Sequence, residues 1–157
     1  MVKINKVAHV VLHASDFEKS VAFFRDSLEM EMVDYRKEVG RAFFSLGTQH
    51  HDIAVFEDKG ERTKGTLGLV HVAFQIEGGL DELAEAHQLL VRNGVPVDAI
   101  MDHGFTRSVY FHDPDGNGLE FFVEAFADQA EGLQYIRDHG GSAKPLRLPE
   151  VKVEAQA

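Results

Sequence analysis

Two histidines and one glutamate in this sequence are of types that bind divalent metals. His9 lies in the segment AHVVL and His71 in the segment LVHVAF, both rich in β-branched residues. Glu120 lies between Leu119 and Phe121 in an apolar run, where an unpaired carboxylate would be costly to remove from water. A bound dication would neutralise this carboxylate, as would an ion pair with an arginine. A lone histidine in a strand is more often a hydrogen-bonded core residue than a ligand, so the elements that position these residues decide between the two interpretations.

Composition limits which kinds of site are available. The chain has 157 residues, no cysteine and nine histidines, so any metal must use nitrogen and oxygen ligands. A net charge of −10 without a basic block argues against nucleic acid as a partner. No apolar run approaches the roughly 20 residues that cross a bilayer, and the N-terminus lacks a secretory pattern. We therefore expect a soluble protein that stays in the cytoplasm, with no membrane partner.

The elements around the two histidines form a repeat. The strand of residues 7–12 matches that of 69–74, and each is followed by a helical pattern. Ser15 or Asp16 is the predicted cap of the first helix. Asp81 is the predicted cap of the second, which the pair Asn93-Gly94 ends. Hairpin-like segments follow, and residues 44–56 align without a gap on residues 110–122, which places Ile53 on Leu119 and Ala54 on Glu120.

The repeat predicts an α+β fold built from two tandem βαβββ modules, which form a half-open barrel around a metal site. The first module covers about residues 4–58 and the second about 67–126, joined by a link near 57–66. Together they make one domain of residues 1–126. Residues 127–157 depart from the repeat and predict a short helix over 128–138 followed by a mobile tail.

Repeat symmetry then defines the metal site. Alternate side chains of a strand share a face, so the two histidines converge if those faces line one cleft. The inward position of the last strand holds Glu120 in the second module and Ala54 in the first. Two histidines and one carboxylate form the facial triad of non-haem Fe(II) oxygenases, which leaves coordination positions open. Mn(II) shares these ligand preferences, so the metal stays Fe(II) or Mn(II).

The chain resembles the vicinal oxygen chelate superfamily. The resemblance rests on AHVVL, LVHVAF, the turn DPDGNGLE over residues 113–120 and the doubled βαβββ plan. Within that group the segments HHDIAVF (50–56) and DHGFTRSVYFHDPDGN (102–117) look most like a one-domain type I extradiol dioxygenase. The resemblance implies an Fe(II)-dependent, catechol 2,3-type enzyme of aromatic catabolism. Its partners would be a small aromatic diol and O2, and a homodimer is the commonest default among its possible oligomers.

The resemblance also implies roles for three further residues. His51 maps onto a histidine beside the bound oxygen, where an acid-base group is needed. His103 and Tyr110 map onto residues that line the substrate, one to stabilise its oxyanion and one to hydrogen-bond it. His50 would face solvent, on the opposite side of the strand from His51. Arg107 stands where some relatives have another histidine, which leaves its role open.

Two other functions are compatible with the same fold. A glyoxalase I-like isomerase or lyase would use two metal ligands from each module, so a Glu or His would be expected where this chain has Ala54. Glu57 would reach that position only through a bulge. A drug-sequestering resistance protein would suit the acidic charge but has no need of three ligand positions.

Overall fold

The structure is a computed structural model that describes residues 9–48, 50–60, 69–139 and 143–151. The predicted strand residues Val7 and Ala8, most of the predicted link and the last six residues of the tail lie outside the described residues. The chain divides into two compact units. The N-terminal unit is Met1–Leu67 together with Asp113–Gly116, and the C-terminal unit is Gly68–His112 together with Asn117–Ala157.

The N-terminal unit has the predicted βαβββ order. Its strands are β1 (Val10–Ala14), β2 (Glu31–Arg36), β3 (Arg41–Ser45) and β4 (Ile53–Glu57), arranged β1-β4-β3-β2. Helix α1 (Phe17–Ala22) runs into the π-helical turn η1 (Phe23–Ser27), and the short 3-10 turn η2 (Lys37–Val39) joins β2 to β3. Of the two predicted caps, Asp16 takes the role, since its carboxylate accepts from Lys19 N at 3.2 Å. Phe24 and Phe44 are fully buried and anchor the core of this unit.

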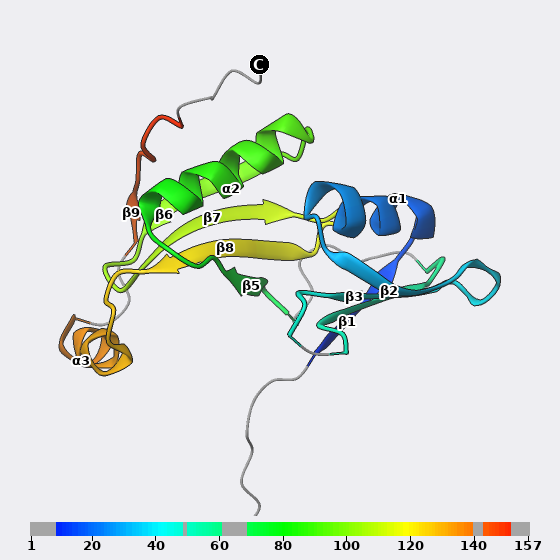
Figure 1. Cartoon of the computed structure of the whole chain (residues 1–157), viewed down its shortest axis with the longest axis horizontal. Coiled ribbons are helices and arrows are strands. Elements are labelled where there is room, and N and C mark those ends of the chain that lie inside the picture. The colour runs from blue at the N-terminus through cyan, green and yellow to red at the C-terminus, as the bar shows by residue number, and fades with distance from the viewer. Residues whose placement is uncertain (1–8, 49, 61–68, 140–142, 152–157) are drawn as a thin grey trace, which may run out of the picture. The chain divides into compact units, whose positions relative to one another are not determined.

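The C-terminal unit repeats the order. Its strands are β5 (Val72–Gln75), β6 (Val97–Asp102), β7 (Thr106–His112), β8 (Gly118–Glu124) and the short β9 (Lys144–Pro145), arranged β5-β8-β7-β6-β9. Helix α2 (Leu80–Arg92) lies along one face of this sheet, over β7 and β8 (Figure 1). Helix α3 (Gln129–His139) covers the region predicted to be helical. Strand β9 was not predicted, because two residues carry no periodicity.

The predicted cap of α2 is wrong. The helix begins at Leu80, so Gly79 is the N-cap and Asp81 lies inside the first turn. Gly79 has no side chain to offer, and instead its amide donates to Glu82 Oε2 at 2.7 Å. This backward reach is half of a capping box and satisfies one free amide of the helix start. The predicted end is confirmed, with Asn93 as the C-cap and Gly94 in the left-handed region at φ 67°.

Strand register confirms the repeat in its last strand and corrects it in the strand before. Parallel pairing aligns Val11 with Ala54 in one unit and Ala73 with Glu120 in the other, so Ala54 and Glu120 are equivalent. Antiparallel pairing places Phe43 opposite Ala54 and Tyr110 opposite Glu120. The gapless alignment, which set Phe44 on Tyr110, is therefore wrong by one residue. From Phe43 to Ala54 the first hairpin has one residue more than the second has from Tyr110 to Glu120, a difference that hydrophobic pattern alone does not reveal.

The turn Asp113–Gly116 packs within the N-terminal unit although β7 and β8 flank it in sequence. The Asp115 carboxylate accepts from the Ser15 amide at 2.9 Å, from the Ser15 hydroxyl, and from the Ser20 hydroxyl at 2.9 Å. Burial acts to raise the pKa of Asp115, but these hydrogen bonds outweigh it and hold the pKa below its usual value. Among the helices of the described residues, none is long and apolar enough to cross a membrane.

Candidate metal and substrate site

A pocket in the C-terminal unit contains most of the predicted site residues. It has a volume of about 340 Å³, within the range of small-molecule sites. The pocket is lined by residues from β5, β7, β8 and the β6–β7 turn: His71, Ala73, His103, Phe105, Thr106, Tyr110, Glu120 and Phe122. Its walls therefore combine two imidazoles, a phenol and a carboxylate with apolar surface.

His71 and Glu120 form a pair in this pocket. His71 Nε2 lies 3.0 Å from Glu120 Oε2, and Glu120 is 7% exposed. His71 directly precedes β5 and Glu120 lies on β8, two strands that pair in parallel. Among the described residues the carboxylate has no arginine partner. The arginine alternative is thus unsupported in this part of the chain, and the carboxylate depends on His71 and Tyr110.

Tyr110 and His103 form a second hydrogen-bonded pair beside the first. Burial first, and then the negative charge of Glu120, raise the pKa of Tyr110, which keeps the phenol protonated at neutral pH. Glu120 is its opposite neighbour on β8. His103 Nε2 lies 2.7 Å from Tyr110 Oη.

Gly118 allows β8 to approach the residue before β5. A Cβ added at Gly118 would collide with the carbonyl oxygen of Val70 and would lie 3.2 Å from His71 Cβ. Neither neighbour is the flexible end of a long side chain, so the approach requires glycine. The second glycine of DPDGNG thereby fixes how closely His71 stands to the strand of Glu120. The sequence contained the signal, a Gly at the start of an apolar strand, but its meaning depends on the parallel pairing.

The N-terminal unit contains His9 and His51. Their ring centroids are 4.6 Å apart, and His51 also stacks on Phe43 at 4.8 Å with planes 16° apart. Burial, and then the charges of His50 and His9, lower the pKa of His51 against the opposing effect of Asp52. The expectation that His50 and His51 face opposite sides of a strand is wrong. Both precede β4, and their Nδ1 atoms are 2.5 Å apart, although His50 is exposed as predicted.

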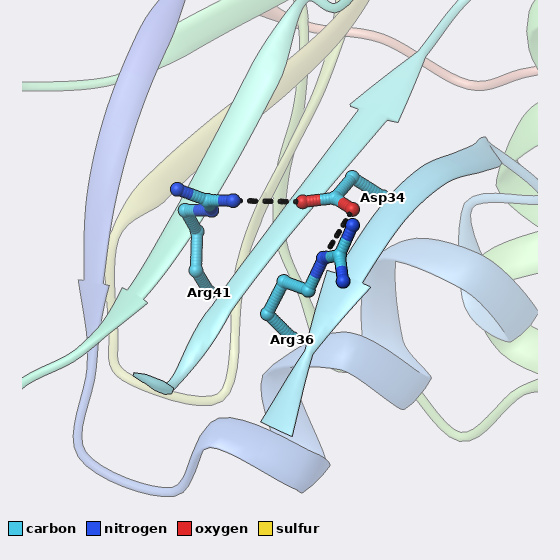
Figure 2. A network of polar contacts seen from close by, with 3 residues as sticks. All are labelled: Asp34, Arg36 and Arg41. Atoms are coloured by element: carbon cyan, nitrogen blue, oxygen red, sulfur yellow. Dashed lines mark hydrogen bonds and ion pairs between the residues drawn. The ribbon is translucent and has the colours of Figure 1, made fainter. Parts of the chain in front are cut away.

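A network of charged side chains contacts the Phe43 ring through Arg41. The Asp34 carboxylate lies between the guanidinium groups of Arg36 and Arg41, at 3.0 Å and 3.2 Å (Figure 2). The Arg41 guanidinium carbon lies 5.1 Å from the centre of the Phe43 ring, within cation–π range. This contact restrains the ring on which His51 stacks.

The donor set fits a divalent metal in part. Within the described residues, no group of three histidine or acidic side chains gathers at metal-binding distance. The His71–Glu120 separation of 3.0 Å equals the spacing of two adjacent ligands on one ion, about 3 Å for bonds of roughly 2.1 Å at right angles. A buried carboxylate and an imidazole are also the kinds of ligand that such divalent ions bind in proteins. The residues present therefore suit a metal, with His71 and Glu120 as two of its ligands.

Comparison with known proteins agrees with this chemistry. The model of the "Glyoxalase/Bleomycin resistance protein/Dioxygenase superfamily" matches residues 6–121. This chain belongs to that superfamily. It is 30% identical over 156 residues to biphenyl-2,3-diol 1,2-dioxygenase 3 of Rhodococcus globerulus, a match covering 92% of this chain and 80% of the relative. The resemblance to the vicinal oxygen chelate group is thus confirmed.

Other members of the superfamily are similar to a comparable degree. The metallothiol transferase FosB of Staphylococcus saprophyticus is 29% identical over 139 residues, covering 87% of this chain and 88% of the relative. The solved structure of the fosfomycin resistance protein FosX of Listeria monocytogenes aligns with a TM-score of 0.62 at 25% identity, covering 83% and 98% of the two chains. The relatives that match are therefore enzymes of more than one reaction class.

For this superfamily member, the structure brings four of the six predicted site residues into one pocket: His71, His103, Tyr110 and Glu120. The other two, His9 and His51, lie beside each other in the N-terminal unit, and the complete triad stays a prediction. Phe105 and Phe122 also line the pocket, and neither was among the predicted site residues. The period of two would have selected Phe122, two residues after Glu120 on the same face of β8.

Proposed function

We propose that this chain is an extradiol ring-cleaving dioxygenase that inserts both atoms of O2 beside the diol of a catechol-type substrate. Its Fe(II) ligands are His9, His71 and Glu120, and Mn(II) would suit the same donors. The observation that carries the proposal is the register equivalence of Ala54 and Glu120. One module supplies a carboxylate and the other an alanine, which leaves three protein ligands and room for two reactants.

When bound, Fe(II) would hold the diol oxygens and O2 next to each other and stabilise negative charge on the diol. The pocket residues act on the substrate. Tyr110 and His103 present a phenol and an imidazole where a diol oxygen would lie, and both can hydrogen-bond it. Phe105 and Phe122 supply apolar surface for an aromatic ring. His51, whose lowered pKa favours the neutral imidazole, is proposed to accept and return a proton.

The second candidate is a metal-dependent transferase, which the 29% match to FosB favours. The same donors could hold its metal ion. The isomerase alternative expects a ligand at the position of Ala54, which is 1% exposed and has none to offer.

Turnover assays distinguish these candidates. Protein purified without oxygen and loaded with Fe(II) should consume O2 with biphenyl-2,3-diol or catechol and form a yellow ring-fission product. Fosfomycin with a thiol, and a hemithioacetal, serve as the transferase and isomerase substrates. Turnover of either of these, with no O2 uptake on any diol, would falsify the dioxygenase proposal.

Variants test the assigned residues. His9→Ala, His71→Ala and Glu120→Ala should each lose bound Fe(II), measured by metal analysis after gel filtration. His51→Phe should keep the metal and lose about 100-fold or more in kcat. His13→Ala is the matched control, because His13 is an exposed histidine paired with Asp58 at 3.2 Å, and it should change neither quantity. A variant of the triad with undiminished iron removes that residue from the ligand set.

A further inference from the structure

The turn between β6 and β7 carries two pocket residues on a short stretch of backbone. His103 and Phe105 both line the pocket, and Gly104 stands between them in the left-handed region at φ 85°. Internal hydrogen bonds shape the turn: His103 N donates to Thr106 O at 2.9 Å, and Gly104 N donates to Asp102 Oδ1 at 2.7 Å. The position of this backbone therefore determines where both pocket side chains stand.

Tyr135 of α3 packs directly against that backbone. A Cβ added at Gly104 would collide with the Tyr135 hydroxyl and would lie 2.5 Å from ring atoms Cε1 and Cζ. The turn and the ring are thus in contact with no space for a methyl group. Glycine is required at this place twice over, by its backbone conformation and by the ring.

The Tyr135 ring is itself held from two sides. It lies 5.6 Å from the Phe126 ring and stacks on His139 at 4.5 Å, with planes 22° apart. The rest of α3 is weakly packed, since the helix has no buried residue and Leu133 and Ile136 are exposed. Tyr135 is half-buried, so this side chain is a principal contact of α3 with the described part of the unit.

Arg107 also contacts this turn. Its Nε lies 3.5 Å from Asp102 Oδ1, and its Nη1 donates to the Gly104 carbonyl at 3.5 Å. Arg107 does not line the pocket. The residue that stands in place of a histidine in some relatives thus contacts the same turn as Tyr135.

We propose that Tyr135 is a positioning residue for the substrate pocket, which holds the 103–105 turn and so sets the places of His103 and Phe105. Helix α3 then determines substrate affinity without touching the substrate. What the pocket binds rests on the proposed function, whereas the contact between Tyr135 and the turn does not.

The test compares Tyr135→Ala with Tyr135→Phe and with Leu133→Ala, an exposed position on the same helix. Hydrogen exchange of the metal-free protein measures the exchange rates of the His103 and Gly104 amides. Anaerobic titration of the Fe(II) protein measures the Kd of biphenyl-2,3-diol. Tyr135→Ala should accelerate exchange of both amides and raise Kd and KM about tenfold, with iron content unchanged and kcat changed less. Tyr135→Phe should remain within about twofold of the parent because the ring stays, and Leu133→Ala should match the parent.

A double variant distinguishes loss of the contact between Tyr135 and the turn from a general loss of α3 structure. Gly104→Ala alone introduces both backbone strain and the collision with the ring, and in the Tyr135→Ala background only the strain remains. Its effect on exchange should therefore be smaller in that background. Equal effects in both backgrounds, or a Tyr135→Ala protein whose exchange and diol affinity match those of Leu133→Ala, would overturn the proposal. If the parent protein binds no diol, the proposed function fails while the exchange data still decide the role of Tyr135.

Discussion

Glu120 is a residue whose burial costs folding stability and whose carboxylate is a candidate metal ligand. Its carboxylate is 7% exposed on a strand whose neighbours Leu119 and Phe121 are buried. Burying a charge in such a place is costly unless it is paired. His71 and Tyr110 supply partial compensation, and a divalent ion would complete it. The sequence predicted the anomaly correctly from residue type alone, but it could not identify Tyr110 as the partner, because that contact depends on strand register.

Gly118 is the residue on which the spacing of the His71–Glu120 pair depends. Gly118→Ala should reduce Fe(II) affinity about 10- to 100-fold, since the new methyl group displaces Val70 and His71 from β8. Its φ lies outside the left-handed region, so the effect is steric. The measurement is competitive Fe(II) titration against a chelator.

Gly116→Ala is the control for this substitution. Gly116 has φ 77° and nothing within 4 Å of an added Cβ, so alanine there should cost about 1 kcal/mol of stability and leave Fe(II) affinity unchanged. Equal Fe(II) affinity in the two variants would contradict the role given to Gly118.

At the level of elements, the two hairpins differ by one residue. The order of strands and helices follows from the periodicities in the sequence, and so does the match of β4 with β8. The match of β3 with β7 does not follow, because an extra residue in a polar turn changes no hydrophobic pattern. The packing of Asp113–Gly116 within the N-terminal unit was equally hidden, since it depends on hydrogen bonds between residues about 100 positions apart.

Asp115 connects that turn to Ser20 of α1 and to Ser15, which precedes the helix cap. Because hydrogen bonds hold its pKa below the usual value in the folded state, its stabilising contribution is present above the ordinary Asp pKa, near pH 4, and is lost as pH falls through the lower folded pKa. Asp115→Asn should therefore lower Tm by roughly 2 to 6 °C at pH 7 and by progressively less toward pH 3.

Thermal unfolding at both pH values checks this prediction. Asp26→Asn provides the matched control, as Asp26 pairs with its neighbour Arg25 at 2.6 Å on the surface and should contribute little at either pH. A Tm difference for Asp115→Asn that does not change with pH would show that the charge of Asp115 is not responsible.

At the scale of the whole chain, metal binding and folding should be linked. A ligand that binds the folded state alone stabilises it by about 2.7 kcal/mol at 100 times its Kd. Saturating Fe(II) without oxygen should therefore raise Tm by roughly 5 to 10 °C, and a chelator should reverse the shift. Differential scanning calorimetry of the parent and of Glu120→Ala tests this, because the variant should show no shift. A rise of equal size in the variant would place the stabilising ion at another site.

The two copies of the repeat have diverged in pairs of positions. Where the C-terminal unit has Tyr110 opposite Glu120, the N-terminal unit has Phe43 opposite Ala54. A glutamate introduced at Ala54 would enter a fully buried position with a phenyl ring in place of the phenol as its cross-strand neighbour. Glutamate at Ala54 is therefore unfavourable on its own, and only the pair of substitutions would recreate the other copy's arrangement. The two positions of each cross-strand pair therefore act together, and exchanging one copy's chemistry for the other's requires both substitutions at once.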